Sequence, residues 1–163
     1  MDFTKFKTPD WLVIGGGVLF LIGGFLDWFQ FDGQGGWNAF DYTLTGLIPW
    51  LLLVAAAVVT FLLAGGMLKR GDAPWSLIIL GATGLGALLV IIRLITGSDA
   101  SDQGGGPDDG GLDRAAGLWI CVIAAIISVV GAVLSFQAAG GNVRDLTDMD
   151  KMKGAFRNDR QQP

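Results

Sequence analysis

Five of the six tryptophans lie at the ends of long apolar runs, and this placement restricts the fold more than any other feature of the chain. The indole ring prefers the boundary between lipid and water, where its N–H still finds a hydrogen-bond partner. The runs between these markers are close to the roughly 20 residues that a membrane-crossing helix needs. The five are Trp11, Trp28, Trp50, Trp75 and Trp119. The sequence therefore predicts four transmembrane helices.

The predicted spans also fix the domain organisation. They cover residues 11–29, 47–68, 74–95 and 117–136, and the connections between them are too short to form a domain. We therefore expect an all-α integral membrane bundle of four antiparallel transmembrane helices over 1–137, followed by a cytoplasmic tail over 138–163. The first run ends without a small-residue cleavage site, so we expect a permanent anchor and no signal peptide.

The basic residues predict the orientation in the membrane. Nine of the eleven lysines and arginines fall in the amino end, the second loop or the carboxyl tail, and short basic segments stay on the cytoplasmic side. The opposite side carries eight aspartates against only Arg93 and Arg114. We therefore expect a multi-pass protein of the cell (inner) membrane with both termini cytoplasmic. Its acidic outer surface argues against nucleic acid as a partner.

The composition excludes several chemistries. The chain has no histidine and no glutamate, and its one thiol, Cys121, lies within the fourth span. A histidine-based triad, a His/Cys metal site and an intrachain disulfide are therefore impossible. We interpret Cys121 as a small packing residue. We expect no enzyme activity, no cofactor and no metal site.

Small residues recur at helical spacing within the spans. Helices in lipid associate by close packing, so these stripes predict helix contacts. We expect packing inside the four-helix bundle, with a homo-oligomer interface as the alternative. The residues are Ala56, Thr60 and Ala64, then Ala82 and Gly86, then Ala124, Ser128 and Ala132, and in the first span Gly16, Gly17, Gly23 and Gly24.

Asp27 and Arg93 are opposite charges that the helix pattern places at the same depth. Asp27 follows Trp11 by 16 residues and Arg93 follows Trp75 by 18. At 1.5 Å per residue, both lie roughly 24 to 27 Å from the start of their spans. Charges inside a span usually pair or face an aqueous cavity. We expect a structural ion pair; the alternatives are a proton or ion site and an Arg93 side chain that reaches the surface alone.

Three segments outside the spans have distinct compositions. The loop 97–111 is rich in glycine and aspartate, and we expect a solvated linker rather than a calcium site because it lacks the EF-hand spacing. The first outer loop carries aromatic residues and is expected to fold back onto the bundle rim or to present that rim to a partner. In the tail, apolar residues at three- and four-residue steps predict a short amphipathic helix that docks a partner or rests on the membrane. The tail residues are Leu146, Met149, Met152 and Phe156.

The positions of glycine and tryptophan in the predicted helices resemble those in a known group of proteins. The chain is similar, over most of residues 8–137, to small four-span membrane proteins of unknown function common in actinobacteria. The resemblance implies the four-span topology and carries no activity, ligand or catalytic residue. The segments that carry it are Trp11–Gly17, Phe25–Trp28, Gly36–Asp41, Leu89–Thr96 and Gly117–Gln137.

These observations predict a non-enzymatic membrane protein that serves as a structural or accessory subunit in the cell envelope. The alternative is a small transporter, or an ion- or proton-conducting oligomer, that uses Asp27 and Arg93. The partners expected are the lipid bilayer and either other membrane or cytoplasmic proteins or further copies of the chain.

Overall fold

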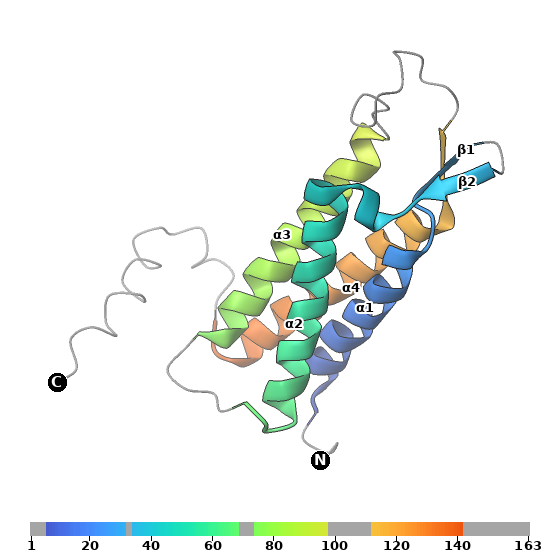
Figure 1. The fold of residues 1–163 in the computed structure, drawn as a ribbon. Helices are drawn as coiled ribbons and strands as arrows, with labels where there is room; N and C mark the ends of the chain where they lie inside the picture. The colour runs from blue at the N-terminus through green and yellow to red at the C-terminus, as the bar shows by residue number, and fades with distance from the viewer. Residues whose placement is uncertain (1–5, 32–33, 69–73, 98–111, 142–163) are drawn as a thin grey trace.

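The computed structural model describes residues 6–31, 34–68, 74–97 and 112–141, and four long helices packed side by side dominate it (Figure 1). These are α1 (Thr8–Phe25), α2 (Ile48–Ala64), α3 (Trp75–Thr96) and α4 (Ala116–Ala138). A π-helical turn, Thr43–Leu47, leads into α2. All four helices are long and apolar enough to cross a membrane, which confirms the predicted all-α bundle of a multi-pass membrane protein.

The first helix starts and ends earlier than the sequence predicts. Its first turn is capped by Asp10, whose carboxylate accepts the backbone N–H of Lys7 at 2.9 Å, and Pro9 suits this turn because it needs no N–H partner. At the other end the backbone is extended at Leu26 and the helix stops at Phe25. Residues 27–29, predicted to be helical, therefore lie outside the span.

Glycines on two neighbouring faces of α1 let the adjacent helices approach closely. Gly16 and Gly23 face α4, while Gly17 and Gly24 face α2. A Cβ atom at Gly16 would lie 2.8 Å from the carbonyl oxygen of Ala124, too close for any side chain. Each glycine therefore replaces side-chain volume with contact between two helices, as the sequence predicts.

The other predicted stripes of small residues also lie inside the bundle. The buried members are Ala56, Thr60 and Ala64 on α2, Gly86 on α3, and Ala124, Ser128 and Ala132 on α4. Gly131 near the end of α4 contacts Pro9 and Val13 near the start of α1, so these neighbours run antiparallel. The hydroxyl of Thr60 donates to the carbonyl of Ala56 at 2.7 Å, which satisfies it within its own helix.

A small sheet, not expected from the sequence, closes one end of the bundle (Figure 1). Its strands are β1 (Phe29–Phe31), β2 (Gln34–Trp37) and β3 (Leu112–Arg114), in the antiparallel order β2-β1-β3. The backbone N–H of Gly117 donates to the carbonyl of Asp27 at 3.0 Å and joins the end of α1 to the start of α4. We call this the cap end, and the opposite end, where α1 and α3 begin, the terminal end.

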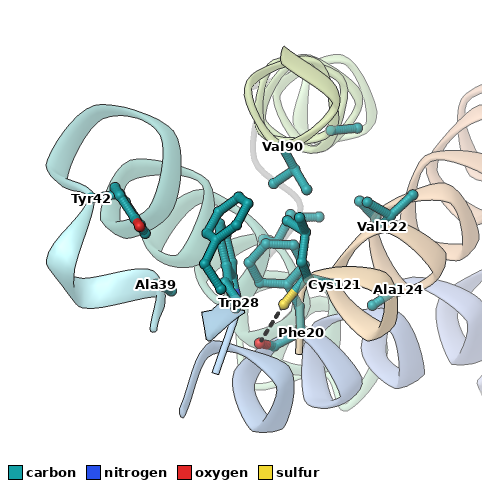
Figure 2. Close-up of a cluster of buried hydrophobic side chains, with 13 residues drawn as sticks. Phe20, Trp28, Ala39, Tyr42, Val90, Cys121, Val122 and Ala124 are labelled. Atoms are coloured by element: carbon teal, nitrogen blue, oxygen red, sulfur yellow. Dashed lines mark hydrogen bonds between the residues drawn. The ribbon is translucent and has the colours of Figure 1, made fainter. Parts of the chain in front are cut away.

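Aromatic residues of the first outer loop fold back onto the end of the bundle, which is one of the two arrangements that the sequence predicts for this loop. Phe29 and Tyr42 are buried, and Trp37 packs partly buried against the same core. Figure 2 shows Trp28 and Tyr42 in this interior together with residues of the helices, among them Val90 and Cys121. Phe29 and Tyr42, with Trp37 in part, thus belong to the hydrophobic core, whereas Phe40 of the same loop is exposed.

Trp28 does not mark the lipid boundary as the sequence predicts. It is fully buried, and its indole N–H donates to the carbonyl of Gly23 at 3.0 Å. Trp11 and Trp119, by contrast, are half exposed on the outside of the bundle, as expected for boundary residues. Trp28 differs because α1 has already ended and the chain turns inward.

The glycine contacts predict a sharp difference between neighbouring positions of α1. Gly16→Ala should lower the free energy of unfolding by about 1 to 3 kcal/mol, because the added methyl group must displace the backbone of α4. Gly15→Ala is the matched control, since a Cβ there meets nothing within 4 Å. Thermal unfolding of the detergent-solubilised protein, followed by circular dichroism, measures both. Equal melting temperatures for the two variants would contradict the described helix contact.

Candidate functional site

The most unusual side chain in the described part of the chain is Arg93, a charged residue buried at the cap end. It lies in the last turns of α3 and is only 4% exposed. Its guanidinium carbon lies 3.6 Å from the centroid of the Tyr42 ring and 5.3 Å from that of the Phe29 ring. Both distances are within the roughly 6 Å over which a cation is attracted to an aromatic face.

Two separate elements hold the aromatic partners of this arginine. Phe29 opens strand β1, and Tyr42 lies between the short 3-10 turn Ala39–Asp41 and the π-helical turn. Their rings meet edge to face, with centroids 5.7 Å apart and an interplanar angle of 77°. The sheet and the turns therefore build an aromatic pocket around the end of the Arg93 side chain.

Two of the hydrogen-bonding nitrogens of Arg93 have no partner in the described part of the chain. Its Nε and Nη2 atoms are buried and have no hydrogen-bond partner among the residues that the structure describes. Leaving such donors unpaired normally costs about 1 to 3 kcal/mol, and more for a charged group. The contacts that stabilise the arginine come from the two ring faces and from a side-chain hydrogen bond with Tyr42.

The structure does not bring Asp27 and Arg93 together. Asp27 is exposed and its carboxyl group lies over Gly36 of β2, where even a Cβ atom would collide with it. No ion pair between the two is found in the described residues, and Tyr42 and Phe29 occupy the space beside the guanidinium. The prediction assumed that α1 continues to residue 29; because it ends at Phe25, Asp27 leaves the span.

Tyr42 lies just outside the second span, and its pKa reflects its burial. Burial raises the pKa above the ordinary tyrosine value, Arg93 opposes this rise, and Asp41 adds to it. The phenol is therefore neutral at physiological pH. A raised native pKa means that any stability this group contributes is lost only as the pH rises past the unfolded value of about 10.

The other predicted site residues are not brought together here. Leu146, Met149, Met152 and Phe156 lie outside the described residues, so the docking helix stays a prediction, as does the solvated loop 98–111. Cys121 is buried beside Phe20, with its sulfur 3.9 Å from the Phe20 carbonyl oxygen, and fits the predicted packing role. Within the described ranges, no cluster of acidic or thiol side chains could hold a metal ion.

The sequence gives little indication of the partners of Arg93. Tyr42 is the chain's one tyrosine and lies between two short turns, while Phe29 stands at the end of an apolar run. Neither has a fixed spacing to Arg93, because strand pairing and a turn bring them together across the bundle. An arginine near the end of a span, with aromatic residues in the facing loop, is the only signal.

A double-mutant cycle distinguishes the observed partner of Arg93 from the predicted one. Arg93→Gln and Tyr42→Leu should each lower the unfolding free energy, with a coupling of about 1 to 2 kcal/mol between them. The cycle of Arg93→Gln with Asp27→Asn is the control and should show a coupling near zero. Thermal unfolding in detergent provides all four values. A larger coupling free energy with Asp27 than with Tyr42 would mean that Arg93 forms the ion pair predicted from the sequence.

Comparison with known proteins gives no match for this chain. No protein-family model, no curated protein and no solved structure matches it. The resemblance to small four-span actinobacterial proteins therefore stays a prediction.

Proposed function

We propose that this chain is a non-enzymatic structural or accessory subunit of the cell envelope, held in the cell membrane with both termini in the cytoplasm. The observation that carries the proposal is the burial of Arg93 in the aromatic pocket of the cap. A charge enclosed by two rings stabilises one arrangement of loops and helices. The pocket favours a fixed surface that another protein recognises over a site that moves a substrate.

The helix interior also supports a structural role over the transport alternative. A conducting path needs a continuous line of polar groups or water. In the described residues, the buried hydroxyls of Thr60 and Thr83 donate to carbonyls of their own helices, at 2.7 and 2.9 Å, whereas the buried Ser128 hydroxyl has no partner. Between Thr83 and Arg93, Val90 of α3 is fully buried, as is Leu53 of α2. The single-chain bundle is thus packed with apolar side chains at this depth.

The proposed orientation rests on the distribution of basic residues and predicts a labelling pattern. In a Cys121→Ala background, Gln30→Cys, at an exposed position of the central strand β1, should react with an impermeant maleimide on intact cells. Met67→Cys, half exposed near the terminal end, should react only after the membrane is permeabilised. Labelling is measured by the mass shift of the purified chain. The reverse pattern would overturn the orientation.

The proposed role predicts that the protein does not transport ions and that it is part of a complex with other proteins. Purified wild-type protein in liposomes should give proton and potassium fluxes equal to those of empty liposomes. In native membranes solubilised with a mild detergent, the chain should migrate in an assembly that contains other proteins in fixed ratio. Arg93→Gln should release the chain from that assembly, because it loosens the cap.

Asp27→Asn is the matched control and should leave the assembly unchanged, since Asp27 does not contact Arg93. Retained helical content by circular dichroism must accompany each variant, so that loss of the assembly is not loss of the fold. A proton flux that Asp27→Asn abolishes would replace the proposal with a transporter. A chain that migrates alone would contradict the accessory role.

A further inference from the structure

The terminal end of the bundle contains a cavity of about 190 Å³ that is separate from the cap. All four helices contribute to its wall: the start of α1, the end of α2, the start of α3 and the end of α4. Helices that just cross a bilayer place their ends at the depth of the lipid headgroups. The cavity therefore lies where a phospholipid headgroup has access to it.

An acidic side chain lies in the wall of this cavity. Asp10 is only 7% exposed. One carboxylate oxygen accepts the backbone N–H of Lys7 at 2.9 Å, and the Asp10 side chain forms part of the cavity wall. A largely buried carboxylate in a cavity wall is suited to bind an ammonium group that donates hydrogen bonds.

The same cavity contains hydrogen-bond donors that suit an anionic group. The Nε1 atom of Trp75 is buried and has no partner among the described residues, although indole N–H groups are usually paired when buried. Ser76 and Ser135 are also lining residues, and Lys7 adds a positive charge to the wall. A phosphate oxygen would satisfy the Trp75 donor and pair with the lysine.

A cavity that contains both an acidic group and hydrogen-bond donors favours a ligand that carries a positive and a negative charge. A simple anion would meet repulsion from Asp10, and a simple cation would leave the Trp75 donor unpaired. Apolar side chains, including Leu63 and Ile79, line the remaining wall. We propose that this cavity binds the headgroup of an amine-bearing phospholipid of the phosphatidylethanolamine type. Its ammonium contacts Asp10, and its phosphate contacts Trp75 and Lys7.

The proposal is tested by native mass spectrometry of the delipidated full chain in detergent. With equal amounts of phosphatidylethanolamine, phosphatidylcholine and phosphatidylglycerol added, the protein should retain phosphatidylethanolamine preferentially. Choline cannot donate hydrogen bonds to Asp10, and phosphatidylglycerol has no ammonium group. Trp75→Phe and Asp10→Asn should each reduce this retention about tenfold, the effect of losing one hydrogen bond to a charged group.

Trp119→Phe is the matched control, because Trp119 is half exposed at the cap end and should not affect retention. Asp10→Asn keeps an oxygen for the Lys7 N–H, so the start of α1 is preserved. A measurement without variants uses the wild type alone: phosphatidylethanolamine should raise its melting temperature more than phosphatidylcholine does. Soluble phosphoethanolamine should compete with the lipid, and inorganic phosphate should not.

Three results would overturn the proposal. The first is equal retention of all three lipids, and the second is retention that does not depend on Trp75 or Asp10. The third is competition by inorganic phosphate that equals competition by phosphoethanolamine, because it would mean an anion site without recognition of the amine.

Discussion

The close approach of α1 to both α2 and α4 is the constraint on which the rest of the molecule depends. Lipid chains are as apolar as the helices, so burying leucine against leucine gives no net gain in a membrane. The gain comes from dispersion contacts between surfaces that fit closely. Gly16 and Gly23 give α1 such a surface toward α4, and Gly17 and Gly24 give another toward α2. Because α1 and α4 are in contact along their lengths, the end of one lies beside the start of the other, and the sheet forms from the chain that extends beyond them.

In the part of the chain that the structure describes, the cap buries a charge with aromatic rings rather than an opposite charge beside it. Guanidinium is planar and more weakly hydrated than ammonium, so transferring it against an aromatic face costs less than transferring a lysine would. Tyr42 and Phe29 offer two such faces to Arg93. Asp27 is not needed for this balance and stays at the surface above Gly36. The arrangement leaves the Nε and Nη2 donors of Arg93 without hydrogen bonds in the described residues, which costs free energy.

Most of the helical part of the fold could be predicted from the sequence, because it depends on local periodicity. The four spans and the buried stripes around Thr60 and Ser128 follow from residue spacing along single helices. The sheet could not be predicted, since strands of three or four residues carry almost no pattern and β1 pairs with β3 from a distant part of the chain. For the Arg93 site, the sequence predicts the depth of the arginine but not the residues that surround it. Its depth follows from helix rise, but its partners depend on where α1 ends.

The pairing of Phe29 with Arg114 joins the loop after the first helix to the residues just before the last one. In synthesis from the amino end, β1 and β2 are made long before β3, so the middle strand keeps one edge unpaired until nearly the whole chain has emerged. The sheet is completed only when the segment that contains β3 lies on the same side of the membrane as β1. Completion of the sheet is therefore coupled to insertion of the fourth helix, and in a chain that stops after the third helix β1 keeps one edge unpaired.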